Sequence, residues 1–318
     1  MNKDTGSTGQ QNGISRHLTV VVPAFNEQDG IVPTLRSLQE TLPGAEIIVV
    51  DDCSNDQTGR RAEELGAKVV RHEFNRGYGG ALKTGMKHAT RRYVAWFDAD
   101  NEHRAEDLLA MAHRLDGESL VAVVASRRRP GRSTLRVLGK YIIRLIARML
   151  GVEMGPDINC GLRVFRRRAI LPYLGLLPDG YSASLTSTMI MIERRYPFSF
   201  HPIDVNPRIG HSKIRLSDGF SALTLVARMV MLFAPLRIFF RSGVFLSGVG
   251  LIYGIAVALT VGLGIPSSAV LVMVAGILFC SLGLIADQIS QLRLDQLVMV
   301  NAEAEESPIE SKDDGRSR

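Results

Sequence analysis

Short apolar runs alternate with segments of helical periodicity over the first 125 residues. Runs of strand length and composition cover 18–23, 46–50, 68–71, 93–97 and 120–125. Between them, helical patterns cover 30–42, a segment that ends at Leu65, a segment that ends at Ala89, and 105–115. This alternation, with short polar loops, predicts an α/β fold whose mostly parallel sheet is covered on both faces.

The pattern continues less regularly beyond residue 125. A basic stretch at 126–132 precedes a predicted helix at 135–150, which has Arg and Lys every fourth residue opposite an apolar side. Such a helix suits an anionic lipid surface, or it is an ordinary helix with one solvated face. A loop at 157–167 leads into a short strand, and a helix at 184–195 and a strand at 198–203 follow.

Two long uncharged runs, 244–265 and 269–286, end the apolar pattern. Each approaches the roughly 20 apolar residues that a membrane-spanning helix needs, so we expect a transmembrane hairpin. Arg237 and Arg241 precede the first run and Arg293 follows the second, whereas the connecting loop has no Lys or Arg. The positive-inside rule then predicts a multi-pass protein of the inner (cytoplasmic) membrane with its large domain in the cytoplasm.

These patterns divide the chain into five parts. We expect a disordered leader at 1–16, an α/β domain at 17–215, interfacial amphipathic helices at 216–242, two transmembrane helices within 243–289, and a charged cytoplasmic tail at 290–318.

Composition narrows the class of protein. The net charge of +6 and the pI of about 9.4 fit a membrane surface or an anionic ligand. Nucleic-acid binding has only this charge in its favour, because no recognition motif is present and aromatic residues make up 6%. Cys53, Cys160 and Cys280 show neither disulfide nor metal-ligand spacing, which favours a reducing compartment.

Acidic residues follow three of the predicted strands. Glu27, the pair Asp51 and Asp52, and the pair Asp98 and Asp100 stand at ends that a parallel sheet brings to one rim. Asp98 and Asp100 are separated by one residue, so on an extended backbone both carboxylates face the same spot. Paired carboxylates suit a hard divalent cation that shares phosphate oxygens, although such acids also cap helices, a role expected of Asp56 or Ser54.

The glycine-rich loop at 75–80 has a simpler interpretation. Gly77, Gly79 and Gly80 do not make GxGxxG, because Leu82 holds the third position, and no P-loop motif is present. We therefore expect a tight turn that enters a helix.

Together these motifs resemble the family 2 glycosyltransferases of the GT-A fold, of the dolichyl- or polyprenyl-phosphate sugar synthase type. The matching stretches occur in family order at 22–27, 48–54, 75–80, 98–100, 126–127, 157–166 and 208–213. The resemblance implies a Rossmann-like, mostly parallel domain that transfers a hexose from a nucleoside-diphosphate sugar to a polyprenyl phosphate, with inversion at the anomeric carbon.

The resemblance also implies roles for individual residues. Those implied for the nucleotide-sugar site are Pro23, Phe25, Glu27, Val50, Asp52, Asp98, Ala99 and Arg127, with Phe25 where tyrosine is common. Asp98, Asp100 and Glu102 would hold Mg²⁺ or Mn²⁺, with Glu102 where many relatives have glutamine. Asp100, Asp157, Arg208 and Lys213 would be catalytic, the two cations near the phosphates and Asp157 near the acceptor.

Two other functions remain open at this stage. A relative could transfer sugar to a polysaccharide, but the Gln-x-x-Arg-Trp motif of processive synthases is missing, since the only tryptophan is Trp96. A catalytically inactive, membrane-tethered nucleotide-sugar scaffold is disfavoured by the intact acidic and basic motifs. The sequence does not name the sugar, the nucleotide or the polyprenol, and it leaves open whether the chain forms a homo-oligomer.

Overall fold

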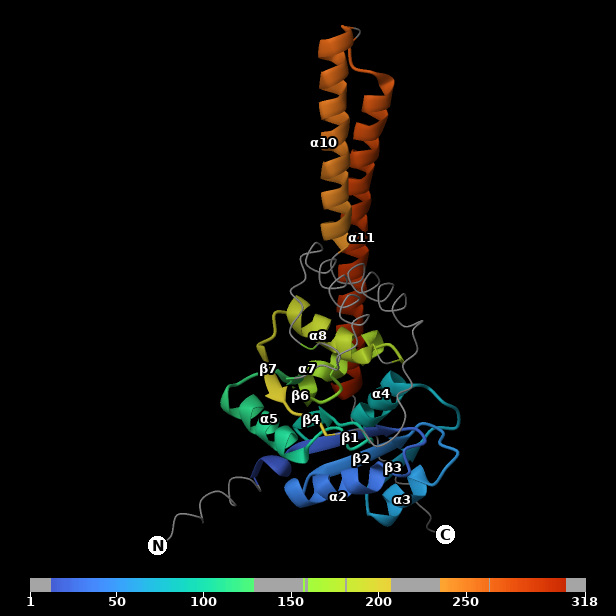
Figure 1. Cartoon of the computed structure of the whole chain (residues 1–318), viewed down its shortest axis with the longest axis vertical. Helices are drawn as coiled ribbons and strands as arrows, with labels where there is room; N and C mark the ends of the chain where they lie inside the picture. Colours follow the sequence, from blue (N-terminus) through green and yellow to red (C-terminus); the bar gives the residue numbers. More distant parts are fainter. Residues whose placement is uncertain are drawn as a thin grey trace, which may run out of the picture.

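A computed structural model describes residues 13–128, 157, 160–180, 182–206, 235–262 and 264–306 of the chain. It contains a helix-covered sheet with a long helical hairpin standing to one side (Figure 1). The predicted helix at 135–150, the motif at 208–213 and most of the expected interfacial segment lie outside the described residues.

The sheet has seven strands in the order β3-β2-β1-β4-β6-β5-β7. Their bounds are β1 (Leu18–Ala24), β2 (Glu46–Asp51), β3 (Lys68–Arg71), β4 (Tyr93–Trp96), β5 (Ala122–Arg127), β6 (Arg163–Arg166) and β7 (Phe198–Ile203). Only β6 runs against its neighbours β4 and β5, whereas the other paired strands are parallel. The predicted mostly parallel sheet is confirmed, with one strand reversed.

Helices cover both faces of this sheet. They are α2 (Ile31–Thr41), α3 (Thr58–Glu64), α4 (Tyr78–His88), α5 (Ala105–Gly117), α7 (Arg167–Ile170), η1 (Leu171–Leu176, a 3₁₀ helix) and α8 (Ala183–Glu193). Successive strand residues point to opposite faces, so Val21 packs with α4, η1 and α8, whereas Val20 and Val22 pack with α2 and α5. The α4, η1 and α8 layer lies between the sheet and the hairpin (Figure 1).

Strand register brings the functional loops to one rim. Ala24 lies opposite Asp51, and Val21 lies opposite Trp96, so the chain after β4 reaches the same level as the ends of β1 and β2. Because β6 is reversed, the loop before it, which contains Asp157, meets the loops that follow the parallel strands.

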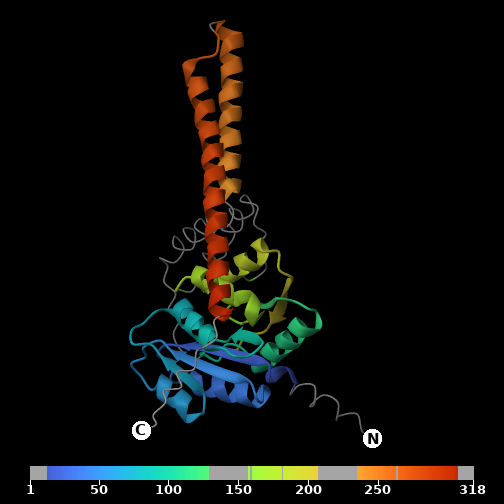
Figure 2. The same ribbon diagram turned by 180° about the vertical axis from the view of Figure 1, so that it is seen from behind.

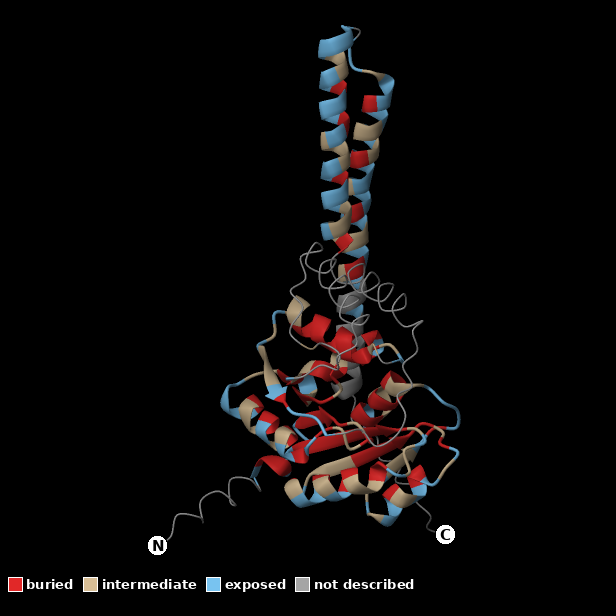
Figure 3. Ribbon diagram, in the orientation of Figure 1, coloured by how far each residue is buried: buried red, intermediate tan, exposed pale blue. Residues whose placement is uncertain are grey.

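The hairpin consists of α10 (Pro235–Val261) and α11 (Ser267–Glu306). By length and composition, α10 and the Ser267–Leu292 part of α11 are long and apolar enough to cross a bilayer. Most of their large apolar side chains are exposed, as the pale colour of the hairpin in Figure 3 shows. The predicted hairpin is confirmed. α10 begins within the segment expected to be interfacial, and α11 continues beyond Leu292 to contact η1 (Figure 2).

Small residues form the seam between the two helices. In α11 the buried positions recur every seven residues, at Ala269, Gly276, Gly283 and Ser290. A Cβ atom at Gly276 would overlap Ser247 Oγ and stand 2.6 Å from the Gly243 carbonyl oxygen. Without a hydrophobic driving force between helices in lipid, such close backbone approach is what holds a hairpin together.

We predict that Gly276→Leu loosens the hairpin, at a cost of about 1–3 kcal/mol for overpacking. The matched control is Gly248→Leu, because a Cβ at Gly248 would meet nothing within 4 Å. Thermal unfolding of the detergent-solubilised chain, followed by circular dichroism, should show a lower midpoint for the first variant only. Equal midpoints would contradict the seam.

Candidate active site

The loops that leave β1, β2 and β4 each turn through a left-handed residue. The φ angle is 53° at Asn26, 65° at Cys53 and 58° at Asn101. Side chains other than Asn and Asp rarely adopt this conformation, which persists where surrounding contacts impose it and is common at functional sites. The three turns mark the rim at which the expected site residues gather.

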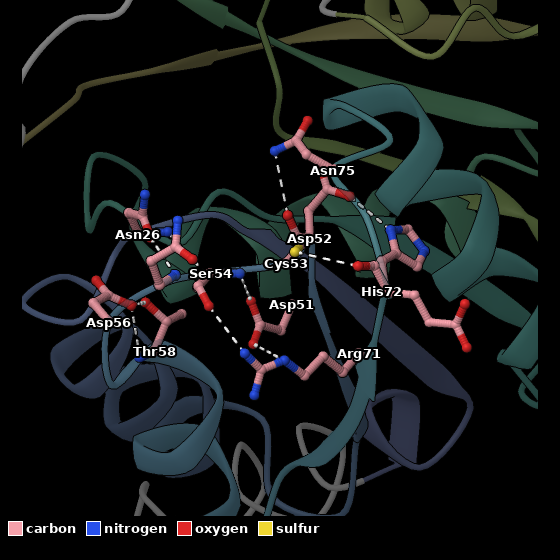
Figure 4. Close-up of polar contacts among 12 residues, drawn as sticks. Asn26, Asp51, Asp52, Cys53, Ser54, Asp56, Thr58, Arg71, His72 and Asn75 are labelled. Carbon is pink, nitrogen blue, oxygen red and sulfur yellow. Dashed lines mark hydrogen bonds and ion pairs between the residues drawn. The ribbon is translucent and has the colours of Figure 1, made fainter.

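The loops after β1 and β2 are tied to each other (Figure 4). The Asn26 amide donates to Ser54 Oγ at 3.0 Å, and the Asn55 amide donates to Asn26 Oδ1 at 2.9 Å. Asp51 accepts the Ser54 amide at 2.9 Å and lies 3.6 Å from Arg71 Nε. These contacts fix one wall of the rim.

Asp56 lies one residue before Gln57, the N-cap of α3, and its carboxylate binds the first residue of the helix. Its carboxylate accepts hydrogen bonds from the amide and hydroxyl of Thr58, at 2.9 and 2.5 Å, and from the Gln28 amide at 3.3 Å. Burial would raise the pKa of Asp56, but the Thr58 hydrogen bonds outweigh it and lower that pKa. Among the three aspartates of this loop, Asp56 is thus the one bonded to the start of α3, whereas Asp51 and Asp52 bind other groups.

Asp52 is a buried anchor for the loop before α4. Its carboxylate accepts hydrogen bonds from His72 Nδ1 at 2.6 Å and from the amides of Arg76 and Gly77 at 2.8 and 2.7 Å. His72 Nε2 lies 2.8 Å from Thr84 Oγ1. The sequence placed Asp52 at the nucleotide but gave no role to His72, because a single histidine after a strand carries no pattern.

The other residues expected in the nucleotide pocket lie close by. Pro23 and Val50 are buried cross-strand partners on β1 and β2. Phe25 and Glu27 follow β1 and are partly exposed, and the Glu27 amide donates to Thr58 Oγ1 at 2.9 Å.

The glycine loop leads directly into α4 and serves packing there. Gly77 has a φ of 84°, which favours glycine. The amides of Gly79 and Gly80 donate to the Asp179 carbonyl oxygen at 2.7 and 3.1 Å. A Cβ at Gly79 would overlap the Pro178 carbonyl oxygen, so backbone from the segment before α8 covers the start of α4.

Asp98 receives hydrogen bonds at both carboxylate oxygens. The Tyr78 hydroxyl donates to Oδ1 at 2.9 Å, and His103 Nε2 lies 3.2 Å from Oδ2. Burial and the charge of Asp98 raise the pKa of Tyr78 well above its ordinary value. Burial would lower the pKa of His103, but the hydrogen bond and charge of Asp98 outweigh it and raise that pKa. The sequence had assigned neither Tyr78 nor His103.

Asp100 is almost fully buried, and its loop is fastened to the start of α2. Its Oδ1 accepts the Glu102 amide at 3.1 Å. The Ala99 carbonyl oxygen accepts the Thr34 hydroxyl at 3.2 Å and would stand 2.5 Å from a Cβ at Gly30. The backbone beside the second aspartate is therefore held in place.

Arg127 joins two of the expected acidic residues. Its Nε lies 2.7 Å from Asp157 Oδ2, and a second nitrogen lies 3.6 Å from Glu102 Oε1. Burial would lower the pKa of Arg127, but the hydrogen bond and charge of Asp157 raise it. Arg127, expected at the diphosphate, thus pairs both with Glu102, an expected metal ligand, and with Asp157, expected near the acceptor.

A second arginine lies beneath this rim. Arg163 is fully buried and donates to the Cys160 carbonyl oxygen at 2.9 Å and to the hydroxyls of Ser187 and Thr188 at 3.1 and 2.7 Å. Burial lowers its pKa to about 10. It ties the loop before β6 to α8 and adds positive charge behind the acidic rim.

The donor set suits a hard cation that takes few protein ligands. Among the described residues, no group of three or more His, Cys, Asp or Glu side chains is arranged to hold a metal. Mg²⁺ commonly uses one or two carboxylates and completes its shell with substrate phosphates and water. Asp98, Asp100 and Glu102 offer only carboxylate oxygens, which fits Mg²⁺ or Mn²⁺. Arg208 and Lys213 lie outside the described residues.

Comparison with known proteins identifies the family. Residues 19–171 match Glycosyl transferase family 2, and residues 234–292 match the GtrB C-terminal hairpin. An uncharacterized protein of Methanocaldococcus jannaschii is 30% identical over 214 residues, which are 64% of this chain and 86% of that protein. The chain belongs to glycosyl transferase family 2.

Two other relatives of this glycosyltransferase have names that state an activity. The polyprenol monophosphomannose synthase of Mycolicibacterium smegmatis is 28% identical, with 65% of this chain and 84% of that enzyme covered. The undecaprenyl-phosphate 4-deoxy-4-formamido-L-arabinose transferase of Klebsiella pneumoniae is 32% identical, but the match covers 49% of this chain and only 50% of that enzyme.

Solved structures confirm the GT-A type of fold. Glucosyl-3-phosphoglycerate synthase from Mycobacterium tuberculosis superposes with a TM-score of 0.57 at 22% identity, over 73% of this chain and 85% of that one. That enzyme was crystallised with Mn²⁺ and UDP, and also with Mg²⁺ and UDP. At this identity the likeness concerns the fold alone.

We predict that His72→Ala lowers the free energy of unfolding by about 2–3 kcal/mol, because a buried carboxylate loses a hydrogen-bond donor. Denaturant unfolding followed by the fluorescence of Trp96, the only tryptophan and fully buried in β4, reports on the sheet. The control His88→Ala removes an exposed histidine of α4 and should change stability by less than about 0.5 kcal/mol. Equal losses would refute the anchoring role of His72.

Proposed function

We propose that this glycosyltransferase transfers a hexose from a nucleoside-diphosphate sugar to a polyprenyl phosphate at the cytoplasmic face of the inner membrane. The observation that carries the proposal is one chain that combines an acidic, arginine-containing rim with an apolar hairpin. The rim suits a cation and a diphosphate, and the hairpin suits a bilayer. Relatives named for polyprenyl-phosphate substrates support the same pairing.

The donor nucleotide would occupy the wall formed by the loops after β1 and β2. Pro23, Phe25, Glu27 and Val50 would line it, and Asp52 would hold the base or ribose. Because the loops are already tied together, little ordering entropy is lost when the nucleotide binds.

The diphosphate would lie against the carboxylates after β4. Asp98, Asp100 and Glu102 would hold Mg²⁺ or Mn²⁺, with Ala99 supplying backbone beside the nucleotide. When bound, the cation neutralises charge on the leaving diphosphate. Arg127, Arg208 and Lys213 would add positive charge for the diphosphate and the lipid phosphate.

The proposed reaction is a direct displacement. An oxygen of the polyprenyl phosphate attacks the anomeric carbon, and the bond from that carbon to the diphosphate oxygen breaks. An α-linked donor then gives a β-linked lipid-phosphate sugar. The phosphate is already anionic near neutral pH, so a strong general base is not required. Asp157 would lie on the acceptor side, where its pairing with Arg127 keeps both groups oriented.

The proposed domain limits follow the apolar and charged segments of the sequence. We place the leader at 1–16, the glycosyltransferase domain at 17–215, interfacial helices at 216–242, the membrane hairpin at 243–289 and a cytoplasmic tail at 290–318. A homo-oligomer is compatible with this arrangement.

We expect Asp100→Asn to lower transfer by on the order of 100-fold or more, because an electrostatic partner of the leaving group is lost. Membranes containing the chain are incubated with a polyprenyl phosphate and a panel of radiolabelled nucleotide sugars, and the labelled lipid is identified. Glu118→Gln, an exposed carboxylate at the end of α5, should retain activity. Undiminished transfer by the Asp100 variant would refute the assignment. No labelled lipid from the unaltered chain would favour the scaffold function.

The proposed orientation predicts which side of the membrane the hairpin turn reaches. In intact cells, a cysteine introduced by Ser268→Cys should react with a membrane-impermeant maleimide, whereas Glu306→Cys at the end of α11 should react only after the cells are permeabilised. The unaltered chain, with Cys53, Cys160 and Cys280, measures the background. The reverse labelling pattern would place the catalytic domain outside the cytoplasm.

A further inference from the structure

The Asp98 carboxylate is held by two side chains from different parts of the chain. Tyr78, the first residue of α4, donates to Oδ1, and His103, five residues after Asp98, lies within hydrogen-bond distance of Oδ2. The described residues thus supply at least one side-chain partner for each oxygen of this carboxylate.

The Asp98 carboxylate is also closely packed on its inner side. The backbone of Gly161, in the loop before β6, approaches so closely that a Cβ there would overlap Asp98 Oδ2. The His103 side chain is only 2% exposed, and its ring meets the edge of the Phe97 ring at 6.0 Å between centroids. The Asp98 side chain is 24% exposed, so its open side faces solvent at the rim.

The two ring nitrogens of His103 differ in their contacts. Its Nδ1 is buried and has no hydrogen-bond partner in the described part of the chain. An orphaned ring nitrogen is unfavourable, so the remaining contact of the ring, from Nε2 to Asp98, carries its polar role. Nε2 must bear a proton to donate to a carboxylate oxygen.

We propose that Tyr78 and His103 are positioning residues that fix the Asp98 carboxylate for the divalent cation. The proposal rests on the function proposed above and adds two residues to its site. An ionised carboxylate offers about four acceptor sites, so hydrogen bonds from Tyr78 and His103 do not prevent it from binding a cation. Partners behind a metal ligand set its orientation and affect metal affinity by about 10–100-fold.

The two ring nitrogens of histidine allow an isosteric test. The side-chain amide of glutamine reaches the position of Nε2, whereas that of asparagine reaches only the position of Nδ1. We expect His103→Asn and Tyr78→Phe to weaken the Mn²⁺-dependent part of UDP or GDP binding by about 10-fold or more. His103→Gln should stay within about threefold of the unaltered chain, because it keeps the donor to Asp98. Binding to the purified full chain is measured by calorimetry with and without Mn²⁺.

The controls separate positioning from folding. Tyr173→Phe removes a hydroxyl that faces Tyr196 in another part of the fold and should leave Mn²⁺-dependent binding unchanged. Trp96 fluorescence shows whether each variant keeps the sheet folded, and if His103→Asn unfolds, Tyr78→Phe decides alone. Equal losses for His103→Asn and His103→Gln, or normal binding by Tyr78→Phe, would overturn the proposal. Because binding is measured without transfer, a failure of the proposed acceptor chemistry would appear only in the lipid-labelling assay.

Discussion

Negative charge is concentrated at one rim of the sheet, and the arrangement of the loops depends on how each carboxylate there is paired. Unpaired carboxylates at this density would repel one another and would lose hydration without compensation. Four of the carboxylates instead meet a side-chain donor from a different segment of the chain. The pairs are Asp51 with Arg71, Asp52 with His72, Asp98 with Tyr78 and His103, and Asp157 with Arg127.

This pairing makes the rim rigid without a regular ladder of backbone hydrogen bonds. The sheet itself is held by apolar burial on both faces, which needs no polar residue at strand ends. The loops at the rim lack such apolar burial, and charge-assisted hydrogen bonds fix their conformation instead. These bonds are stronger than neutral hydrogen bonds. Arg163 provides the same kind of link below the surface. Its buried guanidinium joins the loop before β6 to α8 beneath the acidic rim.

Much of the fold follows from the sequence because apolar periodicity is local. The strands, the covering helices and the uncharged hairpin all leave such a pattern, and so does the Asp98 and Asp100 pair at a strand end. The antiparallel direction of β6 has no such pattern, because the apolar pattern of a four-residue strand does not indicate which way the strand runs. Leu171 to Leu176 folds as a 3₁₀ helix within an apolar stretch that lacks helical spacing. Tyr78, His72 and Thr84 lie 12 to 20 residues along the chain from the residues whose side chains they contact, so no short motif reveals them.

The continuity of α11 has a mechanical consequence. One uninterrupted helix of 40 residues, about 60 Å long, runs from the turn of the hairpin to the layer that contains η1. A bilayer core is about 30 Å thick, so roughly half of the length of α11 remains outside it as a rigid spacer between the lipid and the sheet. A helix tilts when its hydrophobic stretch is longer than the bilayer core is thick. In a thinner membrane α11 would therefore tilt, and the acidic rim would move with it. The reach of the enzyme toward a lipid phosphate would then depend on the thickness of the membrane that holds it.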